Sequence, residues 1–253
     1  MDSLFITIEW NAPNNGARVN VQDELEMRYD RVTTGTFISR PNRFIAKVEL
    51  DGRLETVHVK NTGRCREILQ PGVTAILYDS DNPDRKTRYD LIAAYKGDML
   101  INIDSQAPNK AFQEFIPVSG LFGDDPIIHP EYTHGDSRFD FYIEDGDRKI
   151  FVEVKGVTLE HDGICSFPDA PTERGVKHLR GLGKAVEEGY ECYAAFVVQM
   201  KPMKYFTPNY ETHEEFGKVL EEVHRAGVGI LVYDCLVTPD SMTVDSPVPF
   251  RFR

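Results

Sequence analysis

Residues 137–155 read Ser137-Arg-Phe-Asp-Phe-Tyr-Ile-Glu-Asp-Gly-Asp-Arg-Lys-Ile-Phe-Val-Glu-Val-Lys155, and this stretch decides the fold. Two β-rich runs, Phe139–Ile143 and Ile150–Val154, flank an Asp145-Gly146 pair that favours a tight turn, so the stretch is predicted to be a β-hairpin. Side chains alternate between the two faces of a strand. With a loop of two or four residues, one face carries only apolar side chains, namely Phe139, Phe141, Ile143, Ile150, Val152 and Val154. We expect this face to pack on the core.

The opposite face of the predicted hairpin carries Asp140, Glu153 and Lys155. In the expected register Asp140 lies across from Phe151, and Glu153 lies one diagonal step away, roughly 7–8 Å between backbones. A three-residue loop would turn Asp140 toward the core instead. With the even loop, two carboxylates and a lysine converge.

This trio suits metal-assisted cleavage of a phosphodiester. Asp140 and Glu153 offer the hard oxygen ligands that Mg²⁺ or Mn²⁺ prefers, and Lys155 supplies a fixed positive charge for the attacking water or the phosphate oxygens. The alternative is a solvated strand face with a Glu/Lys pair, which is the commoner reading of an isolated Glu-x-Lys. Asp140 on the same face favours the site, as does Gly156, where a ligand can approach the backbone closely.

Length and composition indicate the class of protein. At 253 residues and 41% hydrophobic content the chain can build two modest domains, and no run approaches the ~18 apolar residues of a membrane span. No secretory pattern is present, so we expect a cytoplasmic protein. The four cysteines lack CxxC spacing and are predicted to be buried thiols, not zinc ligands or disulfides; they are Cys65, Cys165, Cys192 and Cys235.

The net charge of −12 argues against a nucleic-acid partner until its distribution is considered. Residues 1–26 carry −4, residues 27–110 carry +3, and residues 111–253 carry −11. A basic module joined to an acidic one is compatible with a nucleic-acid-binding domain attached to a domain whose carboxylates hold metal.

The N-terminal half is predicted to be mostly strands. Residues 1–26 contain one possible strand, Leu4–Glu9, and are otherwise treated as an extension of unknown role. Six strands follow, at Thr36–Ser39, Phe44–Leu50, Leu54–Lys60, Val73–Asp79, Tyr89–Tyr95 and Met99–Ile103. Short strands over so few residues favour a small OB-like barrel, a fold that commonly presents a strand face and loops to oligonucleotides.

Basic residues gather at three places in this module, and each is either a phosphate contact or an ordinary solvated turn. They are Arg40-Pro-Asn-Arg43, Lys60-Asn61-Thr-Gly-Arg64-Cys-Arg66 and Arg85-Lys86-Thr-Arg88. Three clusters in one short module make phosphate contact a serious alternative.

The C-terminal half is predicted to be an α/β domain with a mixed sheet. Helices are expected over Pro108–Ile116, Glu173–Glu188 and Thr212–Ala226, and buried strands over Cys192–Gln199 and Val228–Tyr233. Glu114 and Glu131 are candidate extra ligands, with a surface role as the alternative. Thr172 is a plausible N-cap, and the first turns after it place Arg174, Lys177 and His178 where they can face a phosphate. His213 and His224 are too far apart on their helix to form a metal pair.

Five motifs together resemble the sugar fermentation stimulation protein A family. They are Arg40-Pro-Asn-Arg43-Phe44, Asn61-Thr-Gly-Arg64, Ser137-Arg-Phe-Asp140-Phe, Glu153-Val-Lys155-Gly-Val-Thr158-Leu and Phe167-Pro-Asp-Ala-Pro-Thr-Glu-Arg-Gly-x-Lys177-His178-Leu. The resemblance runs from about Met27 to the C-terminus. It implies an OB-like domain over residues 27–107 and a PD-(D/E)xK nuclease-like domain over residues 108–253. In the nuclease motif the two acids match Asp140 and Glu153, the lysine matches Lys155, and the helical glutamate matches Glu114.

The resemblance also implies a partner, because members of the family are described as binding DNA without sequence specificity. Combined with the basic clusters, it gives a set of predicted nucleic-acid contacts: Arg40, Arg43, Lys60, Asn61, Arg64, Arg88, Arg138, Arg174, Lys177 and His178. DNA is the partner expected from the family, while the residues themselves do not separate DNA from RNA.

Three functions remain open at the level of sequence. The first is a Mg²⁺- or Mn²⁺-dependent nuclease whose barrel grips nucleic acid while the hairpin cuts it. The second is a non-specific DNA-binding regulator of sugar metabolism whose nuclease-like domain does not cleave. The third is a carboxylate-rich enzyme that acts on a small phosphorylated metabolite.

Overall fold

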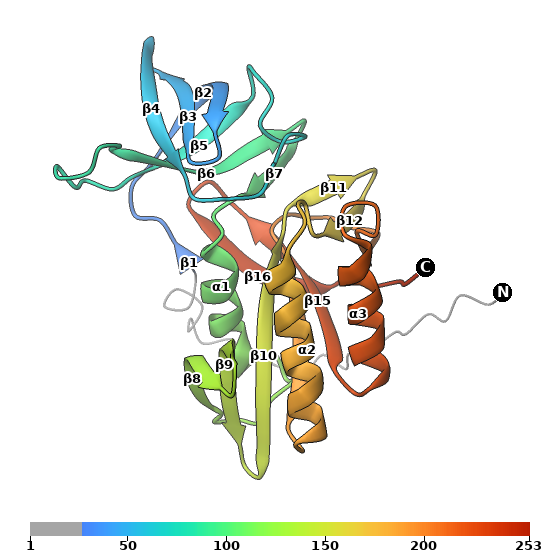
Figure 1. Cartoon of the computed structure of the whole chain (residues 1–253). Coiled ribbons are helices and arrows are strands. Elements are labelled where there is room, and N and C mark those ends of the chain that lie inside the picture. Colours follow the sequence, from blue (N-terminus) through green and yellow to red (C-terminus); the bar gives the residue numbers. More distant parts are fainter. Residues whose placement is uncertain (1–26) are drawn as a thin grey trace.

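The predicted hairpin lies within the large sheet of the protein, in a computed structural model that describes residues 27–253 (Figure 1). The possible strand Leu4–Glu9 falls outside these residues. Strands β9 (Ser137–Asp145) and β10 (Arg148–Val157) are joined by Gly146 and Asp147, and Gly146 has a φ of +59°. A two-residue turn of this kind requires a positive φ, which glycine adopts without strain.

The register of the hairpin differs from the prediction by two residues. Phe151 pairs with Tyr142, not with Asp140, and the ladder ends where Val152 pairs with Phe141. The turn begins one residue later than expected, and this moves every pair by two positions. Asp140 lies one residue past the end of this ladder, and its Oδ2 accepts a hydrogen bond from the Val154 amide. Asp140 and Glu153 therefore still come together.

Both faces of the hairpin are buried. The predicted core face is confirmed for five of its six residues, which share one core cluster, namely Phe141, Ile143, Ile150, Val152 and Val154. Phe139 is the exception. Phe139 was predicted to share a face with Phe141, yet its ring lies 4.9 Å from that of Phe151 in one core cluster. Phe141 packs in the other cluster, with its ring 6.1 Å from that of Phe112. Phe139 lies beyond the end of the ladder with β10, although it still pairs with Tyr132 of the neighbouring strand.

The large sheet has seven strands in the order β1-β16-β15-β13-β10-β9-β8. Its remaining members are β1 (Met27–Arg28), β8 (Ile127–His134), β13 (Glu191–Val198), β15 (Gly229–Val237) and β16 (Ser241–Pro247). Strands β10, β13 and β15 are parallel and the others antiparallel, which confirms a mixed sheet. Because β1 pairs with β16, residues 27–28 belong to this sheet, whereas the prediction had begun the barrel at residue 27.

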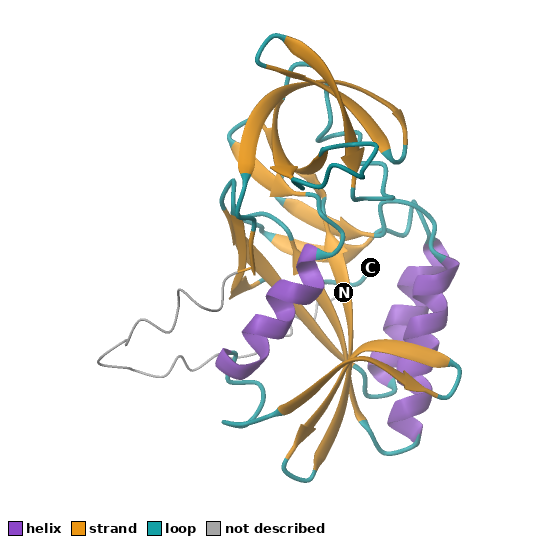
Figure 2. Cartoon of the chain, turned by 90° about the vertical axis from the view of Figure 1, so that its left-hand side faces the viewer, coloured by secondary structure: helices purple, strands orange, loops and turns teal. Residues whose placement is uncertain are grey.

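Helices cover both faces of the large sheet (Figure 2). Helix α1 (Ala107–Phe115) lies on one face, while α2 (Glu173–Glu187) and α3 (Glu214–Arg225) lie side by side on the other. The side chain of Thr172 accepts a hydrogen bond from the Gly175 amide at 3.0 Å, which confirms Thr172 as the N-cap of α2. None of the helices within residues 27–253 is long and apolar enough to cross a membrane.

The N-terminal module is a closed OB-like barrel. Its strands are β2 (Val32–Asn42), β3 (Ile45–Leu50), β4 (Arg53–Val59), β5 (Thr74–Asp79), β6 (Tyr89–Lys96) and β7 (Met99–Asn102). They follow the order β4-β3-β2-β5-β6-β7, and an extra pairing of β4 with β6 closes a ring of five strands. All six predicted strands of this module are present.

A small third sheet, unpredicted, lies next to the seam between the barrel and the large sheet. It consists of β11 (Leu159–His161), β12 (Ile164–Phe167) and β14 (Tyr205–Pro208). Short strands with few apolar residues give little periodic signal. Strand β8, which is mostly exposed, was not predicted either.

Buried polar side chains join the barrel to the large sheet. Gln199, at the end of β13, donates through Nε2 to Asn102 Oδ1 at 3.0 Å and to the Asp104 carbonyl at 3.1 Å. The Asp104 carboxylate accepts from Tyr29 at 3.1 Å and from Lys60 at 2.6 Å. Buried networks whose members are all satisfied hold packed elements in one arrangement. The seam is therefore a built contact between the two parts.

The four cysteines are buried and free, as predicted. Burial raises the pKa of Cys65, Cys165 and Cys192 to about 12. Thiols with such pKa values are poor nucleophiles at neutral pH, so these side chains act as small core residues.

Candidate functional site

Glu153 is the centre of the candidate site. Its side chain is 2% exposed on the face of β10 that α2 covers. The Oε1 oxygen accepts hydrogen bonds from Lys155 Nζ and from His178 Nδ1. The Oε2 oxygen is buried and has no hydrogen-bond partner among the described residues. A buried carboxylate oxygen without a donor is costly unless a cation or a bound water satisfies it.

Asp140 lies beside Glu153, where the hairpin ladder has ended. Its Oδ2 accepts from the Val154 amide at 2.7 Å, so the carboxylate takes the place of the missing ladder bond. Its Oδ1 accepts from Asn109 Nδ2 on α1, also at 2.7 Å. Each oxygen keeps a second lone pair for another partner. Asp140 is thus oriented by both the strand and the helix.

The two carboxylates differ in pKa. Burial raises the pKa of Asp140, and the charge of Glu153 adds to the rise, against the opposing effect of Lys155. Burial alone would also raise the pKa of Glu153, but the Lys155 charge and the hydrogen bond from His178 outweigh it and hold this pKa below its usual range. Lys155 itself is 15% exposed. A buried pair of acids with a single lysine leaves negative charge that a cation can neutralise.

The donor set fits a divalent metal ion. Asp140 and Glu153 provide hard oxygen ligands, and the unpartnered Glu153 Oε2 is the atom that most needs a cation. Mg²⁺ and Mn²⁺ sites commonly use few protein carboxylates and leave the remaining positions to water and substrate.

Two family models match the chain. The sugar fermentation stimulation protein RE domain matches residues 106–241, and the SfsA N-terminal OB domain matches residues 38–103. The chain belongs to the sugar fermentation stimulation protein family.

Curated relatives in this family cover nearly the whole chain. A homolog from Desulfitobacterium hafniense is 59% identical over 216 residues, which is 85% of this chain and 94% of the relative. A homolog from Clostridium beijerinckii is 54% identical over 218 residues, or 86% of this chain and 96% of the relative. The structure of Pyrococcus furiosus SfsA in complex with Ca²⁺ matches with a TM-score of 0.81 at 26% identity, over 89% of this chain and 99% of that one.

His178 belongs to the candidate site, and the sequence pattern did not reveal its contact with Glu153. It was predicted to contact phosphate, but it is buried and its Nδ1 faces Glu153. Arg174 Nε donates to His178 Nε2 at 3.3 Å, so the proton of the neutral ring resides on Nδ1 and is donated to Glu153. His178 precedes Leu182 by four residues, and that helical spacing indicated a buried position.

Two further glutamates, Glu114 and Glu131, were predicted as extra ligands. On α1 the residue whose side chain reaches Asp140 is Asn109, and Glu114 lies more than one turn further along the helix. The Glu131 carboxylate forms an exposed ion pair with Arg138. The catalytic role of Glu114 stays a prediction. Arg138 was predicted to contact nucleic acid, but its charge is paired with that of Glu131.

Several predicted nucleic-acid contacts have structural roles. The Arg40 guanidinium donates to the backbone carbonyls of Arg43, Asn61, Gly63 and Arg64 at 2.7–2.9 Å. It therefore holds the two loops together. Lys60 pairs with the buried Asp104 at 2.6 Å. The Asn61 side chain accepts from the Gly63 amide and donates to the Ile103 carbonyl at 2.9 Å.

Other predicted contacts stay on the surface. Arg43 and Arg64 are exposed, and Arg43 lies over the Phe44 ring at 5.6 Å. Arg88 is exposed too, but it forms a bidentate pair with Asp79, with Nε at 3.0 Å and Nη2 at 2.5 Å. Arg174 and Lys177 are exposed in the first turns of α2, and Arg174 contacts His178, which holds Glu153.

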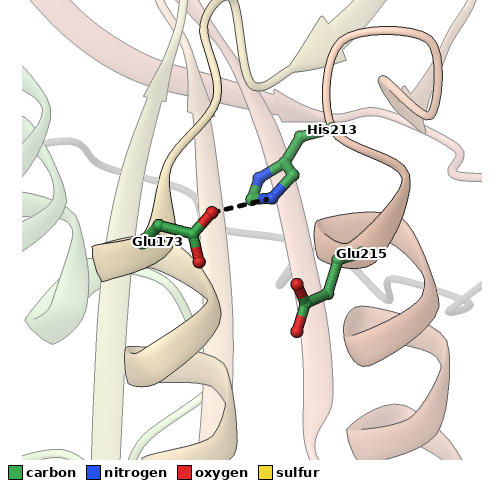
Figure 3. Close-up of side chains that lie close together, drawn as sticks. All are labelled: Glu173, His213 and Glu215. Carbon is green, nitrogen blue, oxygen red and sulfur yellow. Dashed lines mark ion pairs between the residues drawn. The ribbon is translucent and has the colours of Figure 1, made fainter.

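A second group of possible ligands lies where α2 and α3 begin (Figure 3). Glu173, His213 and Glu215 place their ligand atoms within 4.8 Å of one another. His213 Nδ1, however, accepts from the Thr172 amide at 3.2 Å, so Nε2 bears the proton and faces Glu173 at 3.5 Å. A metal on Nε2 would require the other tautomer and would break the bond to Thr172. We assign His213 to supporting the helix N-cap, while Glu215 pairs with Arg180 at 2.9 Å.

Proposed function

We propose that this protein is a divalent-metal-dependent nuclease. The observation that carries the proposal is the buried pair Asp140 and Glu153 beside Lys155, in which Glu153 Oε2 has no partner among the described residues. The similar Pyrococcus furiosus SfsA forms a complex with Ca²⁺, an ion that prefers oxygen ligands as Mg²⁺ does. The OB domain adds support, since this fold commonly binds oligonucleotides.

Each residue has a role that its contacts suggest. Asp140 and Glu153 would hold the ion, which supplies Lewis acidity at the scissile phosphate when bound. Asn109 and the Val154 amide orient Asp140, and His178 orients Glu153. The Lys155 ammonium stabilises negative charge that builds up on the phosphate oxygens during hydrolysis, in a partly buried setting where such charges act strongly.

The test is cleavage of labelled single- and double-stranded DNA and RNA with Mg²⁺, Mn²⁺ or EDTA. We expect cleavage that needs the metal and is lost in Asp140→Asn and Glu153→Gln. Asp98→Asn, in the exposed β6–β7 turn, is the matched control and should cleave normally. Cleavage that persists in both site variants, or no cleavage of any substrate with either metal, would exclude this function.

A second candidate is a DNA-binding regulator of sugar metabolism that does not cleave. It is favoured by Arg43, Arg64 and Arg66, which are exposed and have no acidic partner within residues 27–253. Salt-dependent binding of DNA that survives Asp140→Asn, without cleavage under either metal, would select this function.

A further inference from the structure

Two hollows lie on the path from the barrel to the candidate site. A cavity of about 380 Å³ lies in the seam between the barrel and the large sheet, and its lining includes Ser105, Gly156, Phe167 and Thr172. A second hollow of about 530 Å³ lies on the barrel, and its lining includes Ile38, Arg64, Arg66 and Pro71. The seam cavity is polar and has the size of a site for a small ligand.

The two hollows adjoin each other. Arg43, Thr62 and Gly63 line both of them. A chain molecule in the barrel hollow can therefore continue past Thr62 into the seam. We call the two hollows together the seam groove.

The arginines of the seam groove have no acidic partner among the described residues, whereas other arginines of the barrel are paired with carboxylates. Arg43, Arg64 and Arg66 are exposed, and no carboxylate of the described chain lies within 4.0 Å of their side-chain nitrogens. By contrast, Arg88 pairs with Asp79 at 2.5 Å and Arg85 with Asp90 at 2.5 Å. Unpaired arginines along a groove are the usual contacts for a phosphate backbone.

The groove also offers surfaces for bases. Phe167 lines the seam cavity. Phe44 lines neither hollow, but it is 50% exposed and its ring lies under Arg43, which lines both. Asp169 lines the cavity too, and its Oδ2 already accepts from the Cys65 amide at 2.9 Å. A carboxylate repels phosphate but accepts hydrogen bonds from the amino groups of bases. The seam cavity therefore suits a base better than a phosphate.

The inner end of the groove lies next to the candidate site along the chain, although Asp140, Glu153 and Lys155 line neither hollow. Gly156 lines the seam cavity and directly follows Lys155 in β10. Thr172, also in the lining, caps α2, the helix that carries His178. A nucleotide in the cavity would thus have its neighbouring phosphodiester close to the trio.

We propose that the seam groove binds single-stranded nucleic acid, with the backbone along Arg66, Arg64 and Arg43 and one nucleotide in the seam cavity. A paired duplex does not fit, because a cavity of this volume admits a single unpaired nucleotide. The proposal rests on the proposed nuclease function for the use of the strand, but the binding itself requires no cleavage.

The test measures binding by fluorescence anisotropy in EDTA, where metal-dependent cleavage is stopped. The probes are a labelled 12-nucleotide single-stranded DNA and its blunt duplex. We expect the single strand to bind at least tenfold more tightly. Replacing Arg43 and Arg64 together by alanine should weaken binding and reduce the slope of log Kd against log[salt] by about 0.7 for each arginine. Arg53→Ala, an exposed arginine outside both hollows, is the control and should bind normally.

A cross-linking measurement locates the strand without any variant. Single-stranded DNA carrying 5-iodouracil should cross-link to peptides that contain Phe44 or Phe167. Duplex binding as tight as single-strand binding, or cross-links confined to other surfaces, would overturn the proposal. Single-strand binding in the groove without cleavage in Mg²⁺ or Mn²⁺ would support the groove and exclude the nuclease. Cleavage confined to duplex would support the nuclease and overturn the proposal for the groove.

Discussion

The imidazole of His178 holds the carboxylate of Glu153 through Nδ1, while its Nε2 accepts a hydrogen bond from Arg174. Helix α2 thereby fixes the carboxylate of Glu153 on β10, which lies 25 residues before His178 in the chain. The neutral ring donates a hydrogen bond to one oxygen of Glu153 and leaves the other oxygen for a ligand.

Replacing His178 should weaken metal binding. We expect His178→Leu to reduce the affinity for Ca²⁺ or Mn²⁺ by about 10- to 100-fold, the usual cost of losing a partner that orients a metal ligand. His178→Asn keeps an N–H donor and should recover part of the affinity. Isothermal titration calorimetry provides the measurement, with Lys177→Leu as the control on the exposed side of α2. Unchanged affinity in His178→Leu would show that the ring has only a packing role.

Lys155 should matter for cleavage more than for metal binding. In Lys155→Met the carboxylates lose their ammonium partner, so Ca²⁺ binding is retained while cleavage falls by roughly 10²- to 10³-fold. Lys149→Met removes an exposed lysine from the same strand and should leave both properties unchanged. Loss of metal affinity in Lys155→Met, measured by calorimetry, would contradict the assigned role.

Arg148 should make stability depend on pH in acid. It forms a bidentate pair with Glu191 at 2.7 and 2.9 Å, and this lowers the pKa of Glu191 below its usual range. Because the unfolded chain binds this proton more tightly, the contribution is complete above the unfolded pKa of about 4.3 and is lost as pH falls through the folded pKa.

The Arg148→Met variant should therefore lose about 1 kcal/mol of unfolding free energy at pH 7. The value is modest because the side chains of Arg148 and Glu191 are 40% and 35% exposed. At pH 3 the difference from the parent protein should shrink. Urea unfolding at both pH values gives the measurement, and Arg180→Met, from an exposed pair, is the control. An equal loss at both pH values would contradict the assignment.

Gly156 should tolerate no side chain. A Cβ there would lie 2.5 Å from Gln199 Oε1 and 2.7 Å from Pro108 Cγ. Gly156→Ala would displace Gln199 and disturb the polar seam, at a cost of about 1–3 kcal/mol. Gly183→Ala in α2, where the nearest atom is a Val223 methyl at 3.1 Å, should change stability little. Thermal unfolding of both variants tests the difference, and equal midpoints would contradict it.

Local sequence patterns were enough to predict most of the fold. The barrel strands follow from alternation and turn residues, and the start of α2 follows from Thr172, whose side chain caps the Gly175 amide. The register of the hairpin did not follow, because either Asp145-Gly146 or Gly146-Asp147 could form the turn. Strand β8 was also missed, since its exposed side chains lack the apolar alternation of a strand.

The candidate site was only partly accessible from sequence. The proximity of Asp140, Glu153 and Lys155 follows from one hairpin, a local relationship. The contacts of Asn109 with Asp140 and of His178 with Glu153 join separate elements and depend on how helices pack on the sheet. The same holds for Arg40, whose four carbonyl partners lie in two loops.

The uneven pairing of β10 has a consequence for the order of folding. Its first residues pair with β9 across a two-residue turn, a contact that forms quickly. Residues 153–157 lie past the last β9 partner and are paired only with β13, some 40 positions later in the chain. Since contacts between distant segments form more slowly, Glu153 and Lys155 should gain their places late. The amides of this segment should be protected from hydrogen exchange after those of the turn, so the chain completes its site near the end of folding.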